Sequence, residues 1–180
     1  MKLLAVIVEL NSTMKTNALE AWKRLKDKQS ISFISDNSPC PHFMLLSGVS
    51  FDRLSQLRNI LNELASEHPR CQIKGNGIGI FVRDTPVIHI RWNICPNITS
   101  LQQDILCQLC NEVDQNWVAK SSLAYKDSSY ESLNVSLGLL SDLDFESYMH
   151  VESIAIYRIE TGRPEKKLYE FMLNKLEQSS

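Results

Sequence analysis

Short apolar runs separated by polar turns dominate the pattern of hydrophobic and polar positions along this chain. The run at 3–10 is apolar almost throughout and rich in β-branched residues, which is typical of a buried strand. The segment 87–94 alternates, with Ile88, Ile90 and Trp92 on one face, and predicts a further strand. Other apolar runs place the remaining strands at 31–35, 42–48, 72–82, 133–139, 151–159 and 167–173.

Three segments carry apolar residues at the spacing of one helical face. The clearest follows Ser50, has a stripe of leucines and ends before Pro69. The sequences 17–20 and 100–103 resemble capping boxes, in which side chains bond the free N–H groups of a first turn. They predict where the other two helices begin. The mostly polar segment 120–130 is expected to be a loop.

The mixed order of these elements, with few crossover helices, predicts an α+β fold with antiparallel pairing. We expect a two-lobed structure of pseudo-duplicated antiparallel sheets around a central cleft, with helices on the outer faces. A chain of 180 residues can form one domain with a substantial core. The prediction is a single domain over 1–180, with lobes of roughly 1–84 and 85–180.

The net charge and the apolar runs limit the kinds of partner that this protein is expected to bind. The net charge of −2 argues against a surface that binds duplex DNA, but it leaves room for a nucleotide or an RNA end in a local positive pocket. The apolar run at 3–8 is too short for a signal peptide core or a membrane span. We therefore expect a cytoplasmic protein that does not associate with membranes.

Five cysteines stand at positions 40, 71, 95, 107 and 110. An odd number without a secretion signal favours free thiols. Cys107 and Cys110 form a CxxC, but they lie in a helical pattern and no second pair of ligands follows. Buried helix cysteines are therefore favoured over a zinc or redox site. No metal or other cofactor is expected.

The stretch 40–48 is an apolar strand that carries one imidazole, and 133–139 echoes it with other polar residues. Alternate residues of a strand share a face, so His42 pairs with Met44, and Asn134 pairs with Ser136. If the two strands lie side by side, these four side chains line one cleft. The alternative for His42 is a core histidine bonded to a backbone carbonyl.

Two further groups are candidates for substrate binding. His89 and Arg91 share a strand face, from which Arg91 would bind phosphate and His89 would transfer a proton. Tyr125, Lys126 and Tyr130 lie in the expected loop, where they would stack a base and contact a phosphate. The alternative for both groups is an ordinary solvated surface.

Taken together, four segments resemble the 2H phosphoesterase superfamily, which includes the 2′–5′ RNA ligase-like proteins and cyclic nucleotide phosphodiesterases. The similarity covers nearly the whole chain and depends on the order and spacing of the segments 41–45, 77–81, 134–138 and 154–158.

The resemblance implies two strands that each carry a histidine, any residue, and a threonine or serine. The histidines would serve as general base and general acid on a phosphodiester, and the hydroxyls would hold phosphate oxygens. His42 and Ser136 match one half of each pair. Met44 stands where a hydroxyl is expected, and Asn134 stands where the second histidine is expected. These departures predict weakened catalysis.

Three functions follow from these observations. The first is a 2H-type phosphodiesterase that acts on a 2′,3′-cyclic phosphate or a 2′–5′ linkage, with His42 as the base. The second is a catalytically inactive module of the same fold that binds a nucleotide or an RNA end. The third is a structural or interaction protein with a vestigial cleft. In each case the protein is expected to be a monomer.

Overall fold

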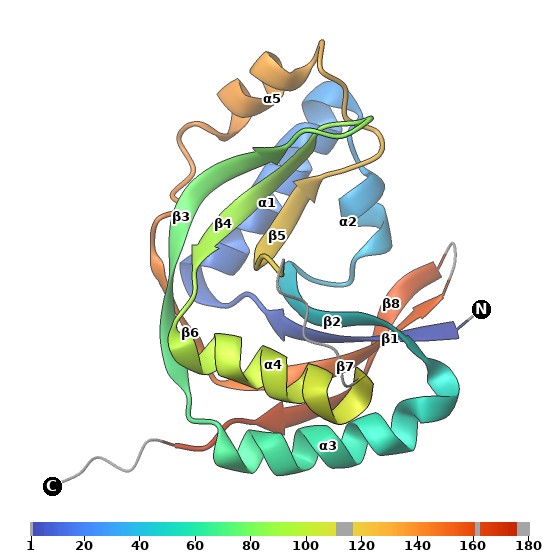
Figure 1. Cartoon of the computed structure of the whole chain (residues 1–180). Helices are drawn as coiled ribbons and strands as arrows, with labels where there is room; N and C mark the ends of the chain where they lie inside the picture. Colours follow the sequence, from blue (N-terminus) through green and yellow to red (C-terminus); the bar gives the residue numbers. More distant parts are fainter. Residues whose placement is uncertain (1, 111–116, 161–162, 176–180) are drawn as a thin grey trace, which may run out of the picture.

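The computed structural model describes residues 2–110, 117–160 and 163–175 (Figure 1). The strands are β1 (Lys2–Glu9), β2 (His42–Ser50), β3 (Cys71–Phe81), β4 (Val87–Asn93), β5 (Lys120–Ala124), β6 (Tyr148–Val151), β7 (Ser153–Glu160) and β8 (Arg163–Met172). The helices are α1 (Ser12–Gln29), α2 (Phe33–Asn37), α3 (Leu54–Glu67), α4 (Pro96–Cys110) and α5 (Leu133–Leu140), with a 3₁₀ turn η1 (Phe51–Arg53) before α3.

The strands form two four-stranded antiparallel sheets, in the orders β2-β1-β7-β8 and β5-β4-β3-β6. This confirms the predicted α+β fold with two antiparallel sheets. The expected halves, 1–84 and 85–180, do not coincide with the sheets. The reason is that β3 belongs to the second sheet, while β7 and β8 return to the first.

Two helices cross from one sheet to the other, so that each packs against the sheet that does not contain the strand before it. Helix α1 follows β1 of the first sheet but contacts β5 and β6 of the second. Helix α4 follows β4 of the second sheet but contacts β2 of the first. One cluster of buried apolar residues therefore runs through both sheets, and Phe43 and Trp92 meet within it at 5.9 Å between ring centroids.

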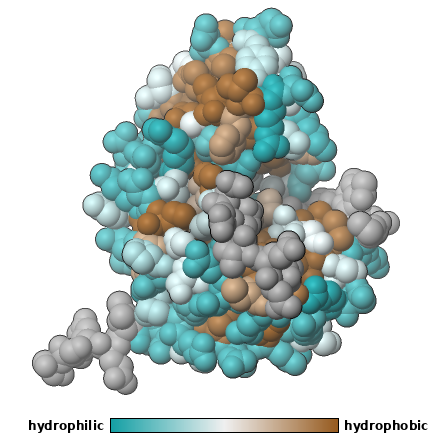
Figure 2. All heavy atoms as spheres, in the orientation of Figure 1, coloured by the Kyte–Doolittle hydropathy of each residue, from teal (hydrophilic) through white to brown (hydrophobic). Residues whose placement is uncertain are grey.

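The hydrophobic pattern explains how the helices cover the sheets. Helix α3 turns Leu57, Leu61 and Leu64 into the core, as its leucine stripe predicts. Ile60 and Ala65 are buried with them, and most other positions of α3 are exposed. Figure 2 shows mostly hydrophilic residues along the lower edge of the molecule, where α3 lies. Within the described ranges, no helix combines the length and the apolar character needed to cross a lipid bilayer.

Five local predictions were wrong. The segment expected as a strand at 31–35 contributes to helix α2, and the expected loop at 120–130 begins with strand β5. The expected strand at 133–139 is helix α5, because a short apolar run does not distinguish a strand from a packed helix. Both capping boxes were also misplaced.

Helix α1 begins at Ser12 and α4 at Pro96, several residues before the predicted starts. The Asn17 side chain does not cap a helix, since its amide donates to the Asp144 carbonyl oxygen at 2.7 Å. A capping sequence inside a longer amphipathic helix is thus used for a tertiary contact instead.

Strand β3 bends around Gly75, where its register against β4 shifts between Gly75 and Ile78. The Gly75 N–H donates to the Ser147 carbonyl oxygen at 3.0 Å. A Cβ at this position would lie 2.1 Å from the Phe145 carbonyl oxygen and 2.8 Å from Met14 Cε. The close approach of the 145–147 backbone therefore requires glycine here.

Gly75→Ala is expected to lower the free energy of unfolding by about 1–3 kcal/mol or more, because backbone must move to admit the methyl group. Urea unfolding followed by circular dichroism measures the change. The matched control is Gly138→Ala in α5, where an added Cβ meets nothing within 4 Å and alanine favours the helix. Equal stability of the two variants would contradict the packing described for β3.

Candidate functional site

A cleft of about 800 Å³ lies between β2, β5, α2 and the residues that flank β4 and β5, a volume typical of small-molecule sites. Aromatic side chains supply much of its wall, from Trp22, Phe33, Trp117 and Tyr125. The cleft therefore combines a broad apolar surface with a few polar groups.

The charges that line the cleft have one sign. Arg83, Lys120 and Lys126 line it together with His42, and the lining residues that the structure describes include no carboxylate. The chain as a whole carries a net charge of −2, so this cation cluster is a local feature. A partly enclosed site with only positive groups attracts anions.

His42 begins β2 and lines the cleft, while Phe43 and Leu45 on the opposite face are buried in the core. The imidazole Nδ1 lies 2.9 Å from the Cys40 carbonyl oxygen. A carbonyl only accepts, so Nδ1 carries the proton in this contact, and Nε2 of the neutral ring keeps its lone pair. The backbone bond and the cleft position, which sequence reasoning treated as alternatives, occur together.

Strand β5 contributes two cleft residues that sequence analysis missed. Lys120 and Ser122 line the cleft, whereas Ser121 and Leu123 are buried. The Trp92 Nε1–H donates to Ser121 Oγ at 3.0 Å, which satisfies that buried hydroxyl. The serines at 121 and 122 give this strand a polar sequence, so the whole segment 120–130 was predicted as a loop.

A signal for this strand is nevertheless present in the sequence. Lys120 to Leu123 repeats the order of His42 to Leu45, with polar or cleft-facing side chains at the first and third positions and leucine at the fourth. The two strands occupy equivalent places, because β2 is the edge strand beside β1 and β5 is the edge strand beside β4.

Two indole N–H groups help to hold the edge strands in place. Trp117 Nε1–H donates to the Met44 carbonyl oxygen at 3.0 Å and links the approach to β5 with β2. Trp22 Nε1–H of α1 donates to the Ser122 carbonyl oxygen at 3.3 Å. Strands β2 and β5 thus lie side by side although they belong to different sheets.

Lys120 is half-buried, and its Nζ lies 4.5 Å from the centroid of the Phe81 ring. Burial, and then the nearby charge of Arg83, lowers the pKa of the Lys120 ammonium. The contact with the ring compensates for part of the lost hydration.

His89 and Arg91 do not line the cleft. His89 is buried, its ring stacks on Phe81 at 4.2 Å between centroids, and its Nδ1 lies 3.2 Å from the Val87 carbonyl oxygen. Burial, and then the charges of Lys120 and Arg91, lowers the pKa of His89. Arg91 is exposed. His89 is therefore neither a cleft residue nor a solvated surface residue, which were the two alternatives expected from the sequence.

Two of the three loop candidates line the cleft. Tyr125 meets Phe33 edge-on at 6.0 Å between centroids, and Lys126 Nζ lies 4.5 Å from the Phe33 ring centroid. Tyr130 is not among the lining residues. Its hydroxyl donates to the Arg83 carbonyl oxygen at 2.7 Å and accepts from the Arg83 N–H at 3.2 Å, so it fixes the loop that carries Arg83.

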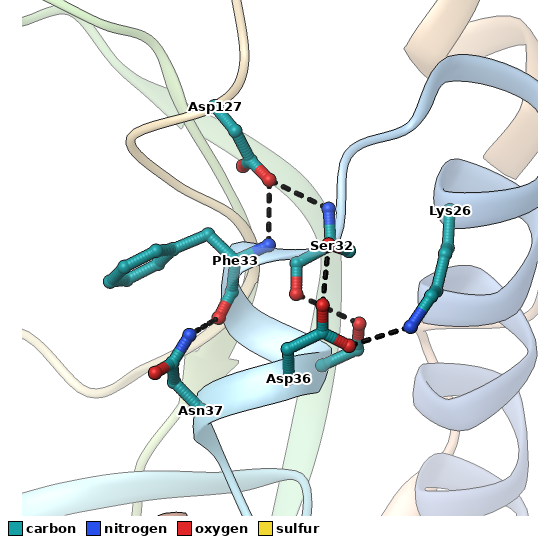
Figure 3. Close-up of polar contacts among 7 residues, drawn as sticks. Lys26, Ser32, Phe33, Asp36, Asn37 and Asp127 are labelled. Carbon is teal, nitrogen blue, oxygen red and sulfur yellow. Dashed lines mark hydrogen bonds and ion pairs between the residues drawn. The ribbon is translucent and has the colours of Figure 1, made fainter. Parts of the chain in front are cut away.

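The residue after Lys126 ties this loop to α2, as Figure 3 shows. Asp127 Oδ2 accepts the N–H groups of Ser32 and Phe33, both at 2.6 Å, at the start of the short helix. Asp36 of α2 in turn contacts Lys26 Nζ of α1 at 2.6 Å. Helix α2, which carries Phe33 of the aromatic wall, is thus bonded to the 126–127 loop on one side and to α1 on the other.

Asn134 and Ser136 lie away from the cleft, contrary to prediction. Asn134 is exposed on α5, and Ser136 is fully buried beneath it. The Ser136 hydroxyl donates to Gln29 Oε1 at 2.5 Å and also lies 3.1 Å from the Ser132 carbonyl oxygen. These contacts attach α5 to α1, so Ser136 serves packing, and the echo of the first strand was accidental.

The cysteines add no metal site to this picture. Within the described residues, no three His, Cys, Asp or Glu side chains are grouped as metal ligands would be. Cys107 is exposed on α4, which corrects the expectation of a buried helix thiol, and the side chain of Cys110 lies outside the described set. Burial, and then the neighbouring Cys95 thiol, raises the pKa of Cys71.

Several solved structures are similar to this one over almost the whole chain. TT0787 of Thermus thermophilus superposes with a TM-score of 0.70 and 17% identity, covering 98% of this chain and 100% of that one. E. coli LigT in its apo form gives a TM-score of 0.65 and 12% identity, over 97% of this chain and 98% of that one. The chain therefore shares the fold of TT0787 and LigT.

A third match is E. coli LigT complexed with 3′-AMP, with a TM-score of 0.65, 14% identity, and 96% and 97% of the two chains covered. A scan of protein-family models and a search of curated proteins both found no match. The resemblance predicted from the sequence is therefore confirmed at the level of the fold.

Lys120→Met is expected to leave the melting temperature at pH 7 equal to or above that of wild type, because the charge is partly desolvated. The folded-state pKa lies below the unfolded value of about 10.4. The destabilisation is therefore fully present below the folded pKa, fades as the pH rises from the folded towards the unfolded pKa, and is absent above it.

Melting temperatures from pH 6 to 10 check this expectation, with exposed Lys23→Met on α1 as the control. A drop of several degrees for Lys120→Met at pH 7 would show that Lys120 stabilises the fold rather than costing it stability.

Proposed function

We propose that the cleft binds the phosphate of a nucleotide or RNA end, of the 2′,3′-cyclic or 2′–5′-linked type, and acts on it with weakened catalysis. The observation that carries this proposal is the cluster of Arg83, Lys120 and Lys126 beside His42, without a carboxylate among the described lining residues. The 2H fold and the 3′-AMP complex of LigT support it.

The aromatic wall suits the base of such a ligand. Trp117 and Tyr125 line the cleft beside the cations, and the Phe33 ring already lies against Tyr125 and Lys126. Stacking on aromatic rings contributes about 1–3 kcal/mol per base and tolerates any base. The cleft would therefore recognise a phosphate and an adjacent base without strong base preference.

His42 is the proposed general base. Its Nδ1 contact with the Cys40 carbonyl oxygen holds the ring with Nε2 as the acceptor. Nε2 would take a proton from a ribose 2′-OH or from water as either one attacks phosphorus. Met44, two residues on, is 40% exposed in the cleft and has no hydroxyl for a phosphate oxygen. One phosphate contact is thus missing, which lowers the rate.

The second candidate is a binding module without turnover. Met44 is the observation that favours it, because a thioether in the place of a hydroxyl removes one hydrogen bond to a phosphate oxygen and leaves binding to depend mainly on the cations. The two candidates share the ligand and differ only in whether His42 moves a proton.

Wild-type protein is expected to bind 3′-AMP, with an affinity that falls as salt rises, and to hydrolyse 2′,3′-cyclic AMP slowly. His42→Ala should retain binding within a few fold and lose about 10²–10⁴-fold in turnover. Tryptophan fluorescence reports binding through Trp22 and Trp117, and chromatography reports turnover.

The control for that pair of measurements is His150→Ala, which removes an exposed imidazole on β6. Absence of 3′-AMP binding by wild type would refute the proposal. Binding without turnover by either protein would select the second candidate.

Tyr130→Phe is expected to weaken 3′-AMP binding about 2–10-fold, because it removes both hydrogen bonds that fix the Arg83 backbone. Isothermal titration calorimetry measures the change, with the exposed Tyr148→Phe on β6 as the matched control. An unchanged dissociation constant would show that Arg83 does not contact the phosphate.

A further inference from the structure

We propose that Lys120 is the general acid of this cleft and completes, with His42, the pair of proton-transfer groups that phosphodiester cleavage uses. The inference rests on the proposed function and names a catalytic residue for that site. Such an acid contributes most on phosphodiesters whose leaving oxygen needs a proton.

The placement of the two residues is the first argument. His42 is the first residue of β2 and Lys120 is the first residue of β5, and both side chains line the cleft. The two edge strands lie side by side and are linked by the bond from Trp117 Nε1–H to the Met44 carbonyl oxygen. A phosphate in the cleft would therefore have one proton acceptor and one proton donor on different walls.

The surroundings of Lys120 are the second argument. The charged side chains placed near it are cations: Arg91 is its register partner on β4, Arg83 follows β3, and Lys126 follows β5. The other titratable neighbours are His89 on β4 and His42 on β2. No ion pair with a carboxylate holds the Lys120 ammonium within the described residues. Such a lysine is suited to a ligand anion and to proton release.

Burial of the Lys120 ammonium makes it a better proton donor. The ammonium is half-buried against the Phe81 ring, and burial followed by the charge of Arg83 lowers its pKa. An acid works best when its pKa is not far above the operating pH. An arginine at this position would keep the charge but would not give up a proton.

The reaction balances with these two groups and water. His42 Nε2 takes a proton from water while the water oxygen bonds to phosphorus of a 2′,3′-cyclic phosphate. One ribose oxygen leaves phosphorus with the bonding electron pair and takes a proton from the Lys120 ammonium. The product is a phosphomonoester, and solvent returns the proton from the imidazolium to the lysine amine. Ser122, on the same face of β5, can donate to a phosphate oxygen.

The test compares two substrates in wild type and Lys120→Arg. Cyclic 2′,3′-AMP has an alkoxide leaving group that needs an acid, whereas uridine 3′-(4-nitrophenyl phosphate) releases a nitrophenolate that does not. Lys120→Arg should lose about 10²–10⁴-fold on the cyclic substrate and less than about tenfold on the nitrophenyl ester. Its affinity for 3′-AMP should change by a few fold, and Lys23→Arg on α1 should keep both rates.

The pH profile adds a readout that a purely electrostatic role would not move. The falling limb of kcat/KM for the cyclic substrate should vanish in Lys120→Arg and move to lower pH in Lys120→His. Equal rates for wild type and Lys120→Arg on the cyclic substrate would overturn the inference, as would equal losses on both substrates. A wild type that binds 3′-AMP but cleaves neither substrate refutes Lys120 as an acid while the binding function stands. A wild type that does neither refutes both.

Discussion

The exchange of helices between the two sheets is the constraint on which this structure depends. Helix α1 leaves the first sheet to cover the second, and α4 leaves the second sheet to cover the first. Each sheet buries part of its apolar face under a helix that follows a strand of the other sheet, so one core serves both. This arrangement brings the edge strands β2 and β5 together without hydrogen-bonding them into one sheet. The cleft forms at this junction.

The cleft combines properties that are unfavourable for stability. Three cations line it, one of them half-buried beside another positive charge, in a chain with an overall negative charge. The surrounding contacts hold this cluster in place: Trp117 and Trp22 donate to carbonyls of β2 and β5, and Asp127 accepts from the first N–H groups of α2. Local violations of the usual charge rules are expected where a protein binds or reacts.

The elements that were predicted correctly are those whose sequence pattern separates a buried side from an exposed one. The strand with His42 was predicted because its inward side is uniformly apolar, and the leucine stripe of α3 fixed that helix for the same reason. The pair Asn134 and Ser136 was misplaced because the run around them is apolar on every side. Lys120 and Ser122 were missed because β5 is short and polar, and its buried Ser121 is satisfied by an indole far away in the sequence.

The amino-acid sequence by itself determined the fold class, most strands and the presence of an imidazole on a strand next to the core. These features follow from local periodicity, which is set by whether neighbouring side chains meet water or apolar surface. Only the tertiary structure decided which residue faces His42 across the cleft, because that depends on how two distant edge strands are held by helices crossing between sheets. It likewise decided that His89 is buried against Phe81 of the neighbouring strand, because that contact depends on the register between β3 and β4.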